Sequence, residues 1–154
     1  MMKPKLQLKD FADNNKRGWS PGTMGILANP AHPVFDDFPT EFHTNWQWWY
    51  VLKTSRALIL DSTPKEYRPL VQVIDNINRN HKLGLIMEYK VGKGKLLICM
   101  ANLPALQDKP EGRQLYASIL HYVSSSKFNP TNEITKKELE KGNYNYACSG
   151  GKTI

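Results

Sequence analysis

The chain has only two cysteines, Cys99 and Cys148, among its 154 residues, and no apolar run approaches the roughly 18 residues that a membrane-spanning helix needs. Two cysteines are too few for the disulfide framework of a small secreted scaffold. The first residues, MMKPKLQLKDF, contain lysines but no apolar segment behind them, so they do not form a secretory signal. These absences predict no membrane partner, and they leave the cellular location open.

The usual patterns of a catalytic or metal centre are also missing. The four histidines have no metal-ligand spacing with one another or with either cysteine. No G-x-S-x-G or G-x-C-x-G segment places a nucleophile at a strand-to-helix turn, and no carboxylate pattern marks a glycosidase pair. The Gly92-Lys93-Gly94 turn is too short for a phosphate loop. The sequence therefore predicts no catalytic residue, no metal ligand and no cofactor.

Positive charge is present but scattered. The formal net charge is +7, and the densest groups are the N-terminal leader, the Lys93/Lys95 turn and the Lys136–Lys137 region. A phosphate-tracking stripe would gather such residues on one element, whereas scattered lysines are typical of a solvated surface. We expect no nucleic-acid partner; a basic nucleic-acid-binding module remains a third alternative that rests on charge alone.

The composition is that of one globular domain, with 40% hydrophobic and 23% charged residues. We divide the chain into a polar leader at 1–22, an α/β domain at 23–130 and a polar C-terminal tail at 131–154. Apolar runs predict strands at 23–28, 57–61, 70–75 and 83–91, and a Gly92–Gly94 hairpin leads into a further strand from Lys95. The runs at 57–61 and 70–75 are nearly continuous, as expected of strands that are covered on both faces.

Two helices are predicted. Thr44 and Gln47 fit a capping box, which predicts a helix over 45–54, and Pro110 with Glu111 opens a helix that runs to Ser124. Strands that alternate with helices predict an α/β three-layer sandwich, with a mostly parallel sheet and the hairpin as an antiparallel addition. The residues expected to be largely buried are Leu58, Ile59, Leu60, Val71, Val73, Ile74, Leu96, Leu97, Ile98, Leu115 and Ile119.

Polar residues follow the apolar runs, where a parallel sheet would gather its ligands. Asp61, Asp75, Asn76 and Asn102 occupy such positions. The Asp75-Asn76 pair combines a carboxylate and an amide that could hold a pair of ligand hydroxyls. Both side chains could equally cap the following turn, and this second interpretation is favoured.

The stretch FHTNWQWWYVL, residues 42–52, holds three of the four tryptophans. Sugars stack on indole rings, and acids and amides bind their hydroxyls, so this segment is a candidate ligand site. The same composition fits a buried packing helix or a domain interface. Because side chains turn by about 100° per helical residue, one core cannot take all three indoles, so one should be buried and another should lie at the surface. The candidate ligand-binding residues here are Glu41, His43, Asn45, Trp46, Trp48 and Trp49.

Three segments resemble the C-terminal region of family 2 glycoside hydrolases from Bacteroidetes, the large β-galactosidase-like enzymes. They are GILANPAHPVFDDFPTEFHTNWQWW, RPLVQVIDNINRNHKLGLIMEYKVGKGKLLIC and PEGRQLYASILHYV, so the likeness covers about residues 23–130. The resemblance implies a class I glutamine amidotransferase-like (flavodoxin-like) fold. In such enzymes the catalytic glutamates belong to a separate barrel, which no segment here matches, and the amidotransferase cysteine elbow is absent.

The resulting hypothesis is a non-catalytic accessory domain of a glycan-degrading enzyme, acting in domain packing, oligomerisation or weak carbohydrate contact. Its partners would be other domains of a glycosidase or a second copy of the chain, with carbohydrate as a possible ligand. As part of such an enzyme it would be periplasmic or extracellular. The alternative is a stand-alone small hydrolase with a site around Asp75 and Asn76.

Overall fold

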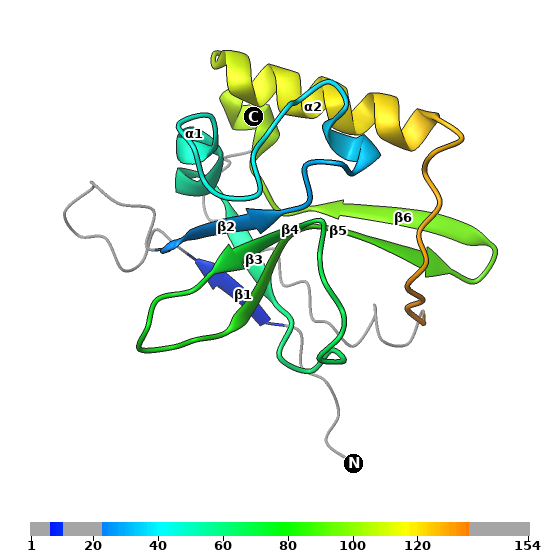
Figure 1. Cartoon of the computed structure of the whole chain (residues 1–154), viewed down its shortest axis with the longest axis horizontal. Helices are drawn as coiled ribbons and strands as arrows, with labels where there is room; N and C mark the ends of the chain where they lie inside the picture. Colours follow the sequence, from blue (N-terminus) through cyan, green and yellow to red (C-terminus); the bar gives the residue numbers. More distant parts are fainter. Residues whose placement is uncertain (1–6, 11–22, 136–154) are drawn as a thin grey trace, which may run out of the picture.

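Residues 7–10 and 23–135 of the computed structural model are described here, and they form one antiparallel sheet with helices packed on one of its faces (Figure 1). The strand order is β1-β3-β5-β4-β2, and β6 pairs with the C-terminal part of β5, from Ile86 to Val91. The strands are β1 (Gln7–Asp10), β2 (Gly25–Ala28), β3 (Arg56–Ile59), β4 (Val71–Ile74), β5 (Lys82–Val91) and β6 (Gly94–Cys99). The helices are the 3-10 turns η1 (Pro33–Phe35) and η2 (Leu103–Leu106) and the α-helices α1 (Trp48–Lys53) and α2 (Pro110–Ser124).

The prediction of a mostly parallel, three-layer sandwich is wrong, and with it the class I glutamine amidotransferase-like (flavodoxin-like) fold. Every pair of named strands is antiparallel. The reason lies in the connections: only non-helical loops join β3 to β4 and β4 to β5. Parallel neighbours need a crossover of a dozen or more residues, usually a helix. Here β3 and β4 lie on either side of β5, so they are not neighbours.

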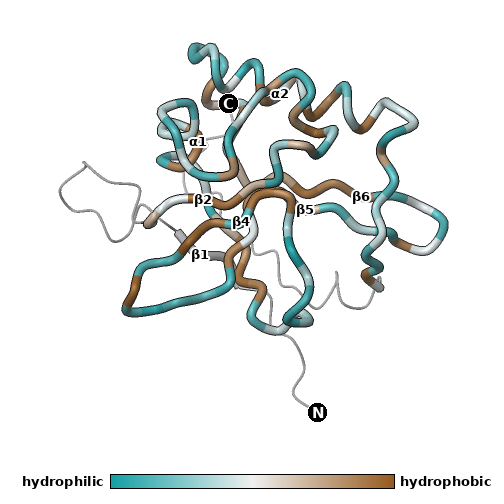
Figure 2. Tube along the Cα trace, in the orientation of Figure 1, coloured by the Kyte–Doolittle hydropathy of each residue, from teal (hydrophilic) through white to brown (hydrophobic). Residues whose placement is uncertain are grey.

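The sheet is covered on both faces, but by different kinds of structure. On one face α1, α2, η1 and η2 enclose the main core, to which Ile26, Trp48, Val73 and Leu115 belong. The other face carries a smaller core of Leu58, Leu60, Tyr67, Met87 and Tyr89, with Ile134 packed against it. Loop side chains therefore provide the second cover that the continuous apolar runs predicted, and Figure 2 shows those runs following the strands through the middle of the molecule.

Several local predictions are confirmed. The helix at 110–124 is present with Leu115, Ile119 and Tyr122 buried, and the hairpin turns at Gly92, whose φ is +59°. The predicted core residues of β3 and α2 are buried, as are Leu60, Val71 and Val73. The remaining four predicted core residues are only half-buried; they are Ile74, Leu96, Leu97 and Ile98.

The ends of the described chain contribute to the sheet. β1 lies within the segment predicted as a polar leader, and it pairs with β3 from Gln7 to Asp10. At the other end, Lys90 exchanges backbone hydrogen bonds with Asn132 and Ile134. Predictions for residues 1–6, 11–22 and 136–154 lie outside the described residues. Among the helices of the described ranges, none is long and apolar enough to cross a membrane.

Candidate functional site

The tryptophan segment connects β2 to β3 and folds differently from the predicted capped helix. α1 begins at Trp48, three residues later than predicted. The Thr44 hydroxyl accepts a hydrogen bond from the backbone N–H of Ile26 at 2.7 Å, so it holds the segment against β2 instead of capping the helix. Gly25 permits this approach, because its φ of +135° and its missing side chain leave room for Thr44. The prediction that Thr44 caps the helix is therefore wrong.

Trp48 is the indole that fills the core. Its side chain is fully buried, and its rings lie edge-on to Phe38 and Phe35 at centroid distances of 5.4 and 6.3 Å. Its indole N–H donates to the Thr40 hydroxyl at 2.8 Å, so the polar edge is satisfied internally. Trp48 is thus a packing residue, and it does not belong to a ligand site.

Trp46 and Trp49 lie at the surface and form, together with Met24, an apolar face that we call the tryptophan ledge. Trp46 is 84% exposed, Trp49 is half-buried, and their ring centroids are 5.9 Å apart. The prediction of one buried and one surface indole is confirmed. The ledge borders an open cavity of about 500 Å³ that is lined by Thr23, Met24, Gly25, Thr44, Asn45, Trp46, Trp49 and Leu52.

The polar groups around the ledge are largely engaged within the fold. The Thr23 hydroxyl donates to the carbonyl of Ile74 at 2.5 Å, and the Asn45 side-chain oxygen accepts from the N–H of Gln47 at 3.2 Å. Glu41 and His43 form an exposed pair at 2.9 Å. The ledge therefore offers apolar surface but few unengaged groups for recognising ligand hydroxyls.

Asp75 and Asn76 are structural residues of the β4–β5 loop. The Asp75 carboxylate is buried and accepts from Arg79 Nη2 at 2.8 Å, Arg79 Nε at 3.2 Å, and the backbone N–H groups of Asn76 and His81 at 2.8 and 3.2 Å. The Asn76 side-chain oxygen accepts from the N–H groups of Asn78 and Arg79. These bonds confirm the interpretation that the pair caps the turn.

The electrostatics of Asp75 agree with this role. Burial alone would raise the pKa of the Asp75 carboxyl, but the hydrogen bonds from Arg79, Asn76 and His81 outweigh burial and lower it. The carboxylate is thus kept charged by the loop that it organises. A carboxyl that acts as a general acid or base would need a raised pKa and access to a ligand.

A second titratable cluster joins three distant segments on the helix-covered face. Tyr122 of α2 donates to the Glu88 carboxylate of β5 at 2.7 Å, and His32 Nε2 lies 3.8 Å from the same carboxylate. Burial would raise the pKa of Glu88, but the contacts with His32 and Tyr122 lower it. The cluster ties the segment before η1, the central strand and α2 together.

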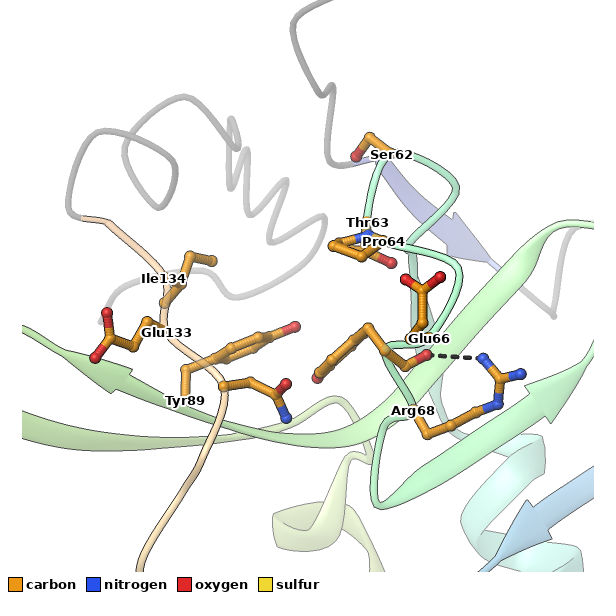
Figure 3. A pocket seen from close by; sticks show the side chains of 10 residues that line it. Ser62, Thr63, Pro64, Glu66, Arg68, Tyr89, Glu133 and Ile134 are labelled. Carbon is orange, nitrogen blue, oxygen red and sulfur yellow. Dashed lines mark hydrogen bonds between the residues drawn. The ribbon is translucent and has the colours of Figure 1, made fainter.

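The structure also contains a pocket that sequence reasoning did not predict, on the face of the sheet opposite the helices. The β3–β4 loop faces the segment around Glu133 across it, with Tyr89 of β5 between them (Figure 3). We call it the tyrosine pocket, because Tyr67 and Tyr89 stack in it with ring centroids 5.4 Å apart. Its volume is about 490 Å³, and its lining is Ser62, Thr63, Pro64, Glu66, Tyr67, Arg68, Tyr89, Asn132, Glu133 and Ile134.

No sequence signal could have found this pocket, because its walls come from three segments that are far apart in the chain. Metal binding finds no support either: within residues 23–135, no three His, Cys, Asp or Glu side chains gather in a way that could hold an ion. The two candidate sites are therefore the tryptophan ledge and the tyrosine pocket.

Comparison with known proteins adds one finding. The family model described as "Domain of unknown function (DUF8487)" matches residues 10–143, a range that includes both candidate sites. No curated protein matches the chain.

Proposed function

We propose that this chain, which belongs to the DUF8487 family, whose description states no function, is a non-catalytic accessory domain of a glycan-degrading enzyme. It would pack on a neighbouring protein domain through the tryptophan ledge. The observation that carries this proposal is the exposure of Trp46 beside Trp49. The glycan-degrading context rests on the resemblance of the segments around FPTEFHTNWQWW and QVIDN to family 2 glycoside hydrolases.

Further exposed apolar side chains come from the same part of the chain. Met24 is 66% exposed and Phe42 62% exposed, and Leu27 and Tyr50 from the same part of the chain are also exposed. Exposed apolar patches often mark interaction sites, and the ledge gathers Met24, Trp46 and Trp49 around one cavity. Interfaces are enriched in tryptophan, tyrosine, phenylalanine and methionine, which are the residue types found here.

A protein partner fits this surface better than a sugar does. Carbohydrate recognition needs hydroxyl-binding groups beside the aromatic faces, whereas Thr23 and Thr44 at the ledge are engaged in holding β2. Burying an indole against another apolar surface needs no such groups, and central tryptophans contribute strongly to protein interfaces. Weak carbohydrate contact is the second candidate, because the indoles border an open cavity of about 500 Å³.

Sedimentation velocity over a concentration series tests the proposal. Without its partner domain the isolated chain should self-associate weakly through the ledge, and Trp46→Ala should abolish that association while leaving the circular dichroism spectrum unchanged. Tyr116→Ala is the matched control, because Tyr116 is also an exposed aromatic residue but lies on α2. The same samples should not hydrolyse an aryl galactoside.

Two results would contradict the proposal. One is a chain that stays monomeric at all concentrations and binds oligosaccharides through Trp46, which would make carbohydrate contact the function of the ledge. The other is loss of association in Tyr116→Ala but not in Trp46→Ala, which would place the interface on α2.

A further inference from the structure

The tyrosine pocket has a buried polar group that the fold leaves without a partner. Tyr67 is buried to more than nine-tenths, and its hydroxyl has no hydrogen-bond partner among the described residues. A buried hydroxyl without a partner costs about 1–3 kcal/mol of stability. Because Tyr67 belongs to the lining of the cavity, a small movement of its ring would let a bound molecule supply the missing hydrogen bond.

The rim of the pocket carries further polar side chains that the fold does not use. Ser62, Glu66, Asn132 and Glu133 line the cavity, and within residues 23–135 their side chains make no hydrogen bond or ion pair. They offer a hydroxyl, an amide and two carboxylates, which together can both donate and accept. At the tryptophan ledge, in contrast, Thr23 and Thr44 are engaged by backbone groups.

Charges of both signs lie around the pocket. Glu66, Glu133 and Arg68 belong to the lining, and the Lys82 ammonium lies over the Tyr67 ring, 5.3 Å from its centroid. Both cations are already engaged: Arg68 Nη1 donates to the Tyr67 carbonyl at 3.0 Å, and Lys82 Nζ donates to Thr63 Oγ1 at 3.0 Å. The lining therefore offers free carboxylates as hydrogen-bond acceptors, while the two cations are held by the fold and leave no free positive group for an anion among the described residues of the lining.

The volume sets the size of the ligand. A cavity of about 490 Å³ lies within the range of small-molecule sites, which span roughly 300–1,000 Å³. The apolar part of the lining, from Pro64, Ile134 and the two tyrosine rings, is suited to the C–H surface of a ring-sized molecule.

We propose that the tyrosine pocket binds a small, neutral, hydroxyl-rich molecule, whose hydroxyls pair with Tyr67, Asn132, Glu133 and Glu66 while its C–H surface contacts the apolar lining. This site does not depend on the tryptophan ledge, which is built by other residues around β2.

Titration calorimetry of the full chain with lactose, maltose and methyl glycosides tests the site. We expect millimolar binding that weakens about tenfold, or about 1.4 kcal/mol, in Tyr67→Phe, which removes only the hydroxyl. The melting temperature of unliganded Tyr67→Phe should be unchanged or higher, because the variant no longer buries an unpartnered hydroxyl. Glu133→Gln should also weaken binding. Glu111→Gln is the matched control, since Glu111 lies on α2, which packs on the opposite face of the sheet.

Several outcomes would overturn the proposal. Failure of every neutral probe to bind at millimolar concentration would remove the site. Binding that is equally tight in the wild type, Tyr67→Phe and Glu133→Gln would place the ligand elsewhere, and loss of sugar binding in Trp46→Ala alone would place it at the ledge. Tighter binding of benzylamine or citrate than of any neutral probe would show that the ligand is charged. Failure of the pocket to bind would leave the sedimentation test of the ledge undecided, because that test measures association and not sugar binding.

Discussion

Replacing Asp75 by asparagine should destabilise the fold without touching either candidate site. The substitution keeps the size and one oxygen of the side chain, but it removes the charge and turns the other oxygen into a hydrogen-bond donor. In the native loop one carboxylate oxygen accepts from Arg79 and the Asn76 N–H, and the other accepts from the His81 N–H at 3.2 Å. The asparagine can keep the first set of bonds, but its NH₂ group would then face the His81 N–H.

The magnitude follows from the burial of the pair. Hydrogen bonds to charged groups contribute about 1.5–3 kcal/mol, and breaking a buried ion pair costs about 3–5 kcal/mol. The Arg79 side chain is 19% exposed and can recover some hydration, so we expect a loss near the lower end, about 3 kcal/mol. Urea denaturation measures this loss as a lower transition midpoint with an unchanged slope.

The pH dependence of the free energy of unfolding provides a second measurement of the same interaction. The pKa of Asp75 is lowered in the fold, so its stabilisation is complete above the pKa of the unfolded carboxyl, about 3.9, and is lost as the pH falls through the folded pKa. The stability curves of the wild type and Asp75→Asn should therefore converge towards acidic pH.

The control for Asp75→Asn is Asp108→Asn, which changes an exposed carboxylate paired with Lys109 and should leave stability unchanged. A midpoint for Asp75→Asn within error of the wild type would refute the structural role of Asp75. If the chain instead hydrolyses glycosides, and Asp75→Asn abolishes turnover while the fold persists, Asp75 belongs to an active site and the accessory-domain proposal is wrong.

Two further substitutions test the helix-covered face. Gly112→Ala should lower the free energy of unfolding by about 1–3 kcal/mol, because its new methyl group would collide with a backbone carbonyl of η2. Gly94→Ala is the control: its methyl group meets no atom nearer than 3.5 Å, so its urea midpoint should equal that of the wild type. Tyr122→Phe should cost about 2 kcal/mol through its lost bond to Glu88. Since the pKa of Glu88 is lowered, this variant should also lose less stability than the wild type as the pH falls below about 4.3; an unchanged pH profile would contradict the pairing.

The helix α2 and the strands could be predicted because their signals are local. Pro110, Glu111 and a complete apolar stripe define α2, and continuous apolar runs define β3 and β4. The direction of the strands could not be predicted in the same way. An apolar run shows that both faces of a strand are covered but not what covers them. Here Tyr67 and Ile134 from loops cover the face that a second layer of helices covers in a parallel sheet.

The candidate sites show the same limit. The pattern from Thr44 to Gln47 satisfies a capping box, yet a backbone group 18 residues away, the N–H of Ile26, takes the threonine hydroxyl. The division of the indoles between core and surface agrees with the prediction, but helical spacing accounts only for Trp48 and Trp49, because Trp46 precedes α1. The tyrosine pocket could not be predicted, since Tyr67, Tyr89 and Ile134 share no local pattern and meet only when the sheet has formed.

The pairing of β5 has a consequence for how the molecule unfolds. This ten-residue strand is hydrogen-bonded to β3, β4 and β6, so the segments of the described sheet reach one another largely through it. Local unfolding that frees β5 would dissolve both cores at once, whereas fraying of β2 would leave the central strands paired. The amides of β5 should thus exchange with solvent only through global unfolding. Its pairings with β4 and β6 join segments that are close in sequence, whereas the β1–β3 and β2–β4 pairings must close long loops, so we expect the outer strands to pair later in folding than the β5–β6 hairpin.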